Sequence, residues 1–233
     1  LNLYGAPMPE VVETFVSEYA LKPKDFIGLT PKLLIEEGER VKAGTPLFYA
    51  KGKEKVLFTS PVSGVVKQVK RGEKRVIEEV IVSADETIEY LYFGVSSISE
   101  LNAEQIKEKM LISGAWTLLR QRPYSVVPNP DTTPKCIIVS GFSSAPLAPD
   151  YSILLKGLGA ELQVGVDALK KMTGVTIHVN VPSQDVRAEE LTKLQNVQIN
   201  TFEGKHPCGN VSVQIEKLDP INKSERVWYL DAQ

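Results

Sequence analysis

The spacing of hydrophobic and polar positions changes along this chain of 233 residues, close to residue 95. Before that point, apolar and aromatic residues form short runs that alternate with charged turns, as at residues 47–50 and 56–59. Such runs predict short, half-buried strands. From residue 135 onward, apolar runs alternate with segments of helical period, which predicts a parallel sheet with connecting helices.

The first half contains a weak internal echo. Residues 38–41 read Gly-Glu-Arg-Val and residues 72–76 read Gly-Glu-Lys-Arg-Val, and each follows an apolar strand. The glycine in each charged turn suits a positive φ. Two similar halves that face each other would form a small flattened barrel, and chance is the alternative explanation for so short a match. Further strands of this barrel are expected at residues 14–21, 76–82 and 88–93.

Residues 37–47 and 60–66 resemble the biotinyl/lipoyl carrier fold. In those carriers a lysine at a hairpin tip is acylated with the cofactor, and Lys53 falls in that register when counted back from Pro61. Its neighbours differ from the carrier signatures, because Gly-Lys-Glu-Lys stands where carriers have Met-Lys-Met or Asp-Lys. We therefore interpret Lys53 as a solvated tip lysine, with a covalently modified carrier protein as the alternative.

Residues 96–134 predict a helical connector. Asn102 and Gln105 have the spacing of a capping box, with Ser99 as a second candidate cap. Apolar residues then follow at helical spacing. Gly114 is expected just beyond the end of this helix, where glycine is common.

A second, shorter helical turn is expected at residues 115–120, and it carries Trp116. The Arg-Gln-Arg-Pro sequence at residues 120–123 should stop it, because the residue before a proline disfavours the helical conformation. Residues 124–134 contain three prolines and are interpreted as a linker.

From residue 135 the pattern alternates between strands and helices. The apolar run at residues 136–139 is typical of a parallel strand that is buried on both faces. Further strands are expected at residues 175–179, 197–200, 211–213 and 226–230. Helices are expected at residues 150–158, 161–171 and 183–194, the last with Ser183, Gln184 or Asp185 as its cap.

These patterns combine the α+β and α/β classes. We expect a small all-β barrel-sandwich hybrid (biotinyl/lipoyl-like) domain at residues 1–95, and a helical connector and linker at residues 96–134. A Rossmann-like α/β domain with a parallel sheet is expected at residues 135–233. The chain begins with Leu1 rather than methionine and stops soon after a predicted strand, so we expect a fragment of a longer protein.

Composition and charge exclude several classes of protein. The formal net charge of −2 lacks the basic footprint of nucleic-acid binding, so no nucleic-acid partner is expected. No run approaches the roughly 20 apolar residues of a membrane span, and no secretory signal is visible. Cys136 and Cys208 lack metal-binding spacing and are expected to be reduced thiols, with a disulfide or redox pair as the alternative.

No familiar catalytic motif is present. The chain lacks G-x-G-x-x-G, G-x-x-x-x-G-K-[ST], H-E-x-x-H and G-x-S-x-G. Ligands of such sheets bind beyond the carboxyl ends of the strands, but the loop at residues 140–146 is too poor in glycine to make a good phosphate cradle. We expect no catalytic and no metal-binding residues; a nucleotide-binding enzyme is the alternative.

The two histidines receive different interpretations. His178 lies in the middle of a predicted strand and is interpreted as an interior or edge residue. His206 lies in a loop at a strand end and is the better candidate for a site, with a purely turn-forming role as the alternative.

Residues 112–124 read I-S-G-A-W-T-L-L-R-Q-R-P-Y. They resemble the motif I-x-S-G-x-W-T-x-L-R-x-R-P-[FY] of the A subunit of the bacterial Na⁺-translocating NADH:quinone oxidoreductase. Shorter matches make the resemblance run from end to end, at residues 58–64, 71–76, 146–148 and 204–207. Chains of that family begin before Leu1 and continue past Gln233.

The resemblance implies a part in a respiratory enzyme. That enzyme oxidises NADH, reduces ubiquinone or menaquinone and exports Na⁺, and it uses FAD, FMN, riboflavin and iron–sulfur centres. The chain itself would be a peripheral subunit on the cytoplasmic side of the bacterial inner membrane, with no transmembrane segment. Its partners would be the other subunits, especially the membrane-embedded B subunit, and its role would be structural or quinone-proximal. The isolated fragment is not expected to catalyse a reaction.

The family in turn resembles the flavin subunit of respiratory complex I and the C subunit of the Rnf electron-transport complex. Those proteins hold flavin, or its counterpart site, at a glycine-rich G-x-G-G-A-G-F-P loop. Residues 113–117 stand in that place here with one glycine, and Trp116 would fill the space that flavin phosphate needs. We therefore expect no cofactor and no NADH site on this chain. The quinone-proximal candidates are Trp116, Arg120, Arg122, Phe142 and His206.

Alternatives to these interpretations are open. Trp116 would also serve as connector core and the two arginines as its solvated end. The C subunit of the Rnf complex is a second candidate family, but its iron–sulfur clusters need paired Cys-x-x-Cys-x-x-Cys runs, which this chain lacks. A carrier modified at Lys53 would carry the added mass of its cofactor.

Overall fold

The computed structural model describes residues 11–183 and 189–232. They form two separately packed units. The first unit contains Thr14–Arg120 and Tyr124–Thr132, and the second contains Gln121–Pro123 and the residues from Thr133 onward. Within the described ranges, no helix has both the length and the apolar character needed to cross a membrane.

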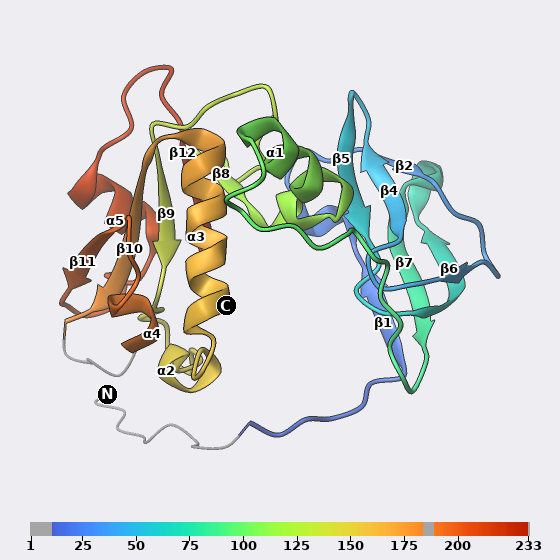
Figure 1. Ribbon diagram of the computed structural model, residues 1–233. Coiled ribbons are helices and arrows are strands. Elements are labelled where there is room, and N and C mark those ends of the chain that lie inside the picture. The colour runs from blue at the N-terminus through green and yellow to red at the C-terminus, as the bar shows by residue number, and fades with distance from the viewer. Residues whose placement is uncertain (1–10, 184–188, 233) are drawn as a thin grey trace. The chain divides into compact units, whose positions relative to one another are not determined.

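The first unit is built on two antiparallel sheets (Figure 1). One sheet has the strand order β1-β7-β6-β3, and the other has the order β2-β4-β5. The strands are β1 (Glu18–Leu21), β2 (Pro31–Leu33), β3 (Arg40–Val41), β4 (Pro46–Ala50), β5 (Lys53–Thr59), β6 (Gly64–Arg71) and β7 (Ile77–Ala84). The expected all-β half of the fold is therefore confirmed.

The core of the first unit combines aliphatic side chains with a cluster of phenylalanine rings. Leu47 and Phe48 on β4 are fully buried, as is Val80 on β7. The rings of Phe48 and Phe58 stack with their centroids 5.0 Å apart, and Phe26 meets Phe58 edge-on at 4.6 Å. Burial of each such side chain is worth about 1.5–3 kcal/mol. This cluster joins β4 and β5 to the short 3₁₀ helix η1 (Pro23–Asp25) that precedes Phe26.

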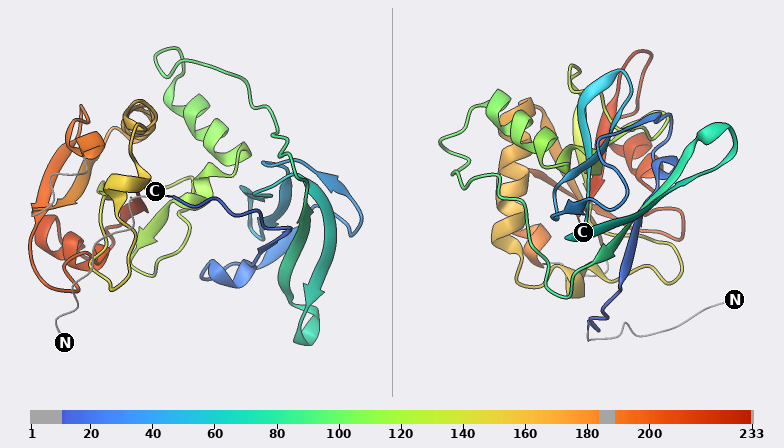
Figure 2. Two further views of the ribbon diagram at one scale, coloured as in Figure 1. Left: turned by 90° about the horizontal axis from the view of Figure 1, so that it is seen from below. Right: turned by 90° about the vertical axis from the view of Figure 1, so that its right-hand side faces the viewer.

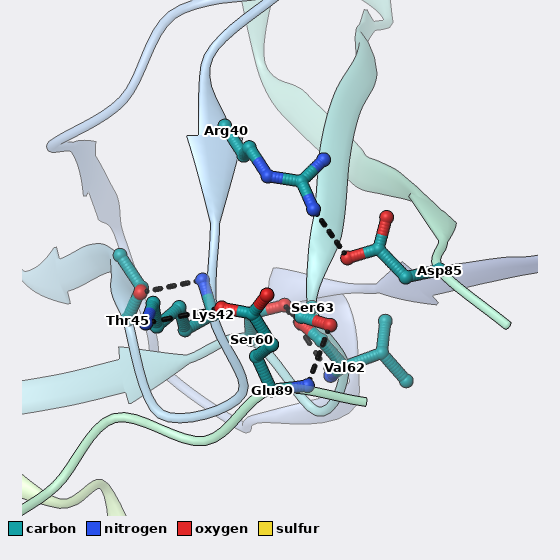
Figure 3. Close-up of polar contacts among 8 residues, drawn as sticks. All are labelled: Arg40, Lys42, Thr45, Ser60, Val62, Ser63, Asp85 and Glu89. Carbon is teal, nitrogen blue, oxygen red and sulfur yellow. Dashed lines mark hydrogen bonds and ion pairs between the residues drawn. The ribbon is translucent and has the colours of Figure 1, made fainter. Parts of the chain in front are cut away.

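The turn at residues 60–63, between β5 and β6, is fixed by its own serines (Figure 3). Ser60 Oγ donates to the carbonyl oxygen of Val62 at 2.6 Å, and Ser63 Oγ accepts from the amide of Glu89 at 2.9 Å. Both serine side chains are buried. A buried hydroxyl without a partner would cost about 1–3 kcal/mol, so these two bonds define the turn.

Gly64 begins β6 at the end of that turn with a φ of 154°. A Cβ atom on this residue would lie 1.8 Å from the carbonyl oxygen of Ser83 on the neighbouring strand β7. The close approach of Gly64 to the β7 backbone therefore requires glycine at this position. In the same region, the Arg40–Asp85 ion pair, at 3.0 Å, links β3 to the end of β7 (Figure 3).

Three expectations for the first half are wrong. Strand β1 begins at Glu18, so the expected strand at residues 14–21 is shorter. Residues 88–93 form no strand; Tyr90 makes only an isolated bridge to Ala43. Gly72 has a φ of −93°, and the positive values fall on Lys74 and Arg75 in η2 (Glu73–Arg75), because these residues close the β6–β7 hairpin instead.

The connector helix is confirmed. Helix α1 (Ala103–Ile112) begins with a capping box in which Asn102 Oδ1 accepts from the Gln105 amide at 2.9 Å. The Gln105 side chain accepts from the Asn102 amide, also at 2.9 Å. Gly114 follows with a φ of 80°, and the 3₁₀ helix η3 (Ala115–Leu118) carries Trp116. The segment expected as a linker instead packs with the first unit as far as Thr132.

The second unit has a five-stranded sheet of order β11-β10-β9-β12-β8. Its strands are β8 (Arg120–Arg122), β9 (Cys136–Ser140), β10 (Thr176–Pro182), β11 (Gln198–Phe202) and β12 (Val227–Asp231). β9 pairs in parallel with β10 and β12, and β10 pairs in parallel with β11, as predicted. β8 was not expected as a strand, since its sequence reads as a helix stop.

Helices cover this sheet, with α3 and α5 on opposite faces (Figure 2). The helices are α2 (Tyr151–Leu154), α3 (Gly159–Thr173), α4 (Glu189–Thr192) and α5 (Val211–Leu218). Cys136 and Ile138 of β9 pack in one buried cluster with Val211 and Ile215 of α5. Because alternate strand residues point to opposite faces, the intervening Ile137 serves the other face, which agrees with the expected doubly buried strand.

Two expectations for the second half need correction. Residues 211–213 were expected to be a strand but begin α5, because Asn210 caps the helix by accepting from the Ser212 amide at 3.0 Å. The expected helix at residues 183–194 is represented by α4. The Ser183 amide donates to the Phe202 carbonyl oxygen at the end of β10, and a capping role of its side chain stays a prediction. The other two expected caps, Gln184 and Asp185, lie outside the described residues.

We predict that Gly64→Ala destabilises the protein by roughly 3 kcal/mol or more, because its Cβ would collide with the backbone of β7. Urea unfolding followed by circular dichroism measures this difference. Gly38→Ala is the matched control: Gly38 also has a positive φ, of 88°, but a Cβ there meets no atom within 4 Å. The control should lose only about 1–2 kcal/mol, and equal losses for the two variants would contradict the steric explanation.

We predict that the two thiols differ sharply in reactivity. Cys136 is 2% exposed, and burial raises the pKa of its thiol to about 11, so it stays protonated at pH 8. Ellman's reagent should therefore modify one thiol per folded chain, Cys208, and the second only after denaturation. In a Cys208→Ser variant the folded protein should show no fast reaction, and two fast thiols in the native protein would refute the assignment.

Candidate functional site

The carboxyl ends of β9, β10 and β11 surround a cavity of about 400 Å³ in the second unit. Parallel sheets bind ligands at this edge, because the loops that follow the strands meet there. We call it the strand-end cavity. Its lining includes Phe142, Ser144, Ser183, Phe202, Lys205 and Cys208.

Two aromatic rings form the apolar part of the strand-end cavity. The centroids of Phe142 and Phe202 lie 6.3 Å apart, and the ring planes are tilted by 37°. Both side chains are half-buried, whereas Lys205 is exposed. The combination of two ring faces with a nearby ammonium group suits a flat molecule that carries polar oxygens.

Ser144 connects the loop after β9 to the loop after β11. Its Oγ accepts from the amide of Gly209 at 2.8 Å and lies 3.1 Å from Nδ1 of His206. Gly209 has no room for a side chain, since a Cβ would lie 2.3 Å from the Ser144 amide nitrogen. The two loops are therefore fastened to each other beside the cavity.

A buried network of side-chain amides on the sheet and on α5 supports these loops. Asn180 on β10 and Gln214 on α5 are fully buried, and Asn180 Nδ2 donates to Gln214 Oε1 at 2.9 Å. Asn200 Nδ2 donates to Asn180 Oδ1 at 3.0 Å, and Gln214 Nε2 donates to the carbonyl oxygen of Gly209 at 3.4 Å. Satisfied amides of this kind fix one geometry, because breaking any link leaves a buried polar group unpaired.

Sequence reasoning missed this network. Gln214 lies among the apolar positions of α5 and is therefore a polar residue at a core position, whereas Asn180 continues the polar alternation of Thr176 and His178 along β10. The position of Gln214 is the signal in the sequence that could have revealed the network.

The two histidines lie in different surroundings. His178 is half-buried on β10, where burial lowers its pKa and the charge of Asp219 opposes that effect. Its Nδ1 lies 3.3 Å from Asn200 Nδ2, so it belongs to the sheet interior. His206 is exposed in the loop after β11, and its Nδ1 lies 3.1 Å from Oγ of Ser144, which lines the strand-end cavity.

The Trp116 region lies in the first unit and is closely packed. The indole is 1% exposed, and its Nε1 donates to the carbonyl oxygen of Pro128 at 3.0 Å. A Cβ on Gly114 would lie 2.4 Å from Oγ1 of Thr59 on β5. No other residue type fits this approach, and Trp116 occupies the interior of the corner between α1 and β5.

The two arginine candidates each pack on an aromatic ring. The guanidinium of Arg120 lies 5.0 Å from the ring centroid of Phe26 and also donates to the carbonyl oxygen of Leu119 at 3.2 Å. Arg122 lies 5.3 Å from the ring centroid of Tyr229 on β12. Both side chains are therefore held within the protein rather than extended as a solvated end.

The five candidates do not gather in one unit. Trp116 and Arg120 belong to the first unit, and Arg122, Phe142 and His206 belong to the second. Within the second unit, Phe142 and His206 approach the strand-end cavity, whereas Arg122 packs on β12. Among the described residues no group of three or more side chains could hold a metal ion.

Lys53 lies at the start of β5, directly after the Lys51–Gly52 turn of the β4–β5 hairpin. Its side chain is exposed, as expected for a tip lysine. Exposure suits an unmodified and an acylated lysine equally, so the carrier interpretation stays an alternative.

Both halves of the chain match known protein families. Residues 1–85 match the family described as the NqrA N-terminal barrel-sandwich hybrid domain, and residues 101–233 match the NqrA second alpha/beta domain. These descriptions agree with the two folds seen in the structure.

Several curated relatives are named as the A subunit of the Na(+)-translocating NADH-quinone reductase. The chain is 34% identical to that of Serratia proteamaculans over all of its own length and 53% of the relative. It is 32% identical to that of Yersinia pestis over all of its length and 52% of the relative. It is 33% identical to that of Haemophilus influenzae over 94% of its length and 49% of the relative.

The chain thus spans about half the length of the curated relatives it matches. Family descriptions cover both of its halves, and full-length similarity to the named relatives agrees with them. This chain belongs to the NqrA family, that of the A subunits of the Na⁺-translocating NADH-quinone reductases.

Proposed function

We propose that this chain is a scaffold component of a Na⁺-translocating NADH:quinone oxidoreductase and holds no redox centre of its own. The packing of Trp116 is the observation that carries the proposal. Its indole is buried and hydrogen-bonded in the place where related proteins are expected to have a glycine-rich flavin loop. A side chain that fills this volume leaves no close backbone approach for a flavin phosphate.

The second unit supports the same conclusion. The loop after β9 runs for ten residues before the short helix α2 begins at Tyr151. Dinucleotide sites place a helix N-terminus directly after the first strand, where its amides meet the phosphates. Here the loop is instead fastened through Ser144 to Gly209. This arrangement favours a scaffold over a nucleotide-binding enzyme.

We assign the quinone-proximal role to Phe142 and His206 rather than to Trp116, Arg120 or Arg122. Phe142 lines the strand-end cavity and His206 is bonded to Ser144 on its border. A quinone ring is flat and carries carbonyl oxygens, which match an aromatic wall and a nearby donor. The other three side chains are engaged within their own units.

The partners in this proposal are the other subunits of the enzyme, above all the membrane-embedded B subunit, with this chain peripheral on the cytoplasmic side. The relatives' name as one subunit of an enzyme supports an assembled state. Exposed apolar residues support it as well: Tyr90, Tyr92 and Val95 are 74%, 77% and 88% exposed within one short segment. Apolar side chains gathered on a surface are typical of contact with another protein.

We predict that the purified chain is colourless and does not bind flavin. Because Trp116 fills the expected flavin site, absorption between about 350 and 500 nm should be absent, and added FMN should keep its full fluorescence. Trp116→Ala tests whether the indole is an integral part of the packed core: its loss should destabilise the fold by roughly 3–5 kcal/mol. A yellow protein, or quenching of FMN at micromolar concentration by the unaltered chain, would defeat the proposal.

We predict that the full-length protein co-purifies with its membrane partners and influences the quinone step. In a complex isolated in mild detergent, Phe142→Ala should raise the KM for ubiquinone-1 roughly threefold or more, because it removes an aromatic wall. NADH oxidation with an artificial acceptor should stay unchanged. Tyr151→Phe serves as a control within the same unit. A normal quinone KM in the assembled Phe142→Ala complex would remove the quinone-proximal role and leave the scaffold role.

A further inference from the structure

A second cavity, of about 200 Å³, lies within the first unit beside the β4–β5 hairpin. We call it the hairpin cavity. Its lining is mixed, and the apolar part includes Phe26, Leu29, Val56, Phe58, Val126 and Val127. Ligand pockets for drug-sized molecules occupy roughly 300–1,000 Å³, so this one admits only a short apolar chain or a single ring.

Two lysines stand at the mouth of the hairpin cavity. Lys51 and Lys53 both line it, and both side chains are exposed. The carboxylate of Glu54, next in the chain, is directed instead at the hairpin turn, where its Oε1 accepts from the Gly52 amide at 3.3 Å. An apolar slot with two ammonium groups at its entrance favours a molecule with an apolar body and an anionic end.

An irregularity in the strand pairing places Lys53 at this entrance. Tyr49 pairs with Leu57, but the next residue, Ala50, pairs with Lys53, so three residues of β5 bulge out of the ladder. Bulges re-aim side chains. As a result Lys53 shares the hairpin cavity with Val56, whereas Lys55 lines a different cavity.

A third cation lies behind the wall. The guanidinium of Arg120 is 5.0 Å from the ring centroid of Phe26, whose side chain forms part of the hairpin cavity. This cation–π contact helps to hold the Phe26 ring in the cavity wall.

Trp116 holds the opposite wall in place. Val126 and Val127 come from the segment that follows the strand β8, and that segment is fixed by the bond from the Trp116 indole to the Pro128 carbonyl oxygen. The cavity is therefore bounded by parts of the chain that are anchored independently of the hairpin.

We propose that the hairpin cavity binds a small amphiphilic anion, a short apolar chain or single ring that ends in a carboxylate. The apolar body lies against the half-buried side chains of Phe26, Leu29 and Val127, and the carboxylate lies between the ammonium groups of Lys51 and Lys53. This site is separate from the strand-end cavity and does not depend on the role in quinone reduction.

Sodium octanoate tests this proposal, with octanamide as a neutral molecule of nearly the same shape. In ¹H–¹⁵N spectra of the chain, octanoate should cause saturable shifts at Gly28, Lys51 and Val127. Octanamide should bind roughly tenfold more weakly. The double variant Lys51→Gln/Lys53→Gln should weaken octanoate binding roughly three- to tenfold and leave octanamide binding unchanged. Added salt should weaken octanoate binding to the unaltered chain.

Lys55→Gln is the matched control, since Lys55 is exposed on the same hairpin but lines another cavity. It should leave octanoate binding unchanged, and circular dichroism should show all variants folded. Equal binding of octanoate and octanamide would overturn the proposal, as would an equal loss in the Lys55→Gln variant. Shifts that do not saturate, or that centre on the exposed residues 90–95, would also overturn it.

Discussion

The burial of Trp116 is the interaction on which the first unit depends. An indole of this kind buries roughly 150–250 Å² and needs a partner for its N–H group. Here the partner is the Pro128 carbonyl oxygen, so one side chain joins the connector to the segment at residues 124–132. The close approach of Gly114 to Thr59 extends that junction to β5. The segment contains Pro128 and Pro130, and the Trp116 hydrogen bond fixes it where Val126 and Val127 line the hairpin cavity.

In the second unit, buried polar side chains hold the loops after the strands in place. Loops after parallel strands have few neighbours, and here they receive support from the sheet below. The chain of hydrogen bonds from Asn200 through Asn180 and Gln214 ends on the backbone of Gly209, whose amide in turn donates to Ser144. Such a chain makes loop position depend on buried amides. The floor of the strand-end cavity is therefore fixed by the chain's own hydrogen bonds.

Much of this fold follows from local signals, and the rest from contacts distant in sequence. The capping box at Asn102, the buried strand β9 and the alternation of strands and helices were readable because each involves neighbouring residues. The strand prediction for residues 211–213 was wrong, because three alternating residues fit a strand and a helix equally well. The cap at Asn210 decides for the helix. The strand β8 was missed since a three-residue edge strand has no pattern of its own.

The sites were harder to predict than the fold, for the same reason. Phe142 and His206 were proposed from their residue types and loop positions, whereas the buried pair Asn180–Gln214 joins residues 34 positions apart. The hairpin cavity depends on a pairing irregularity between Tyr49 and Ala50, and an alternating pattern would have placed Lys53 and Lys55 on the same face. A bulge separates them, so one lysine meets an apolar slot while its neighbour does not. The strand register therefore determines which lysine of this hairpin faces the cavity, and neither composition nor a motif predicts that register.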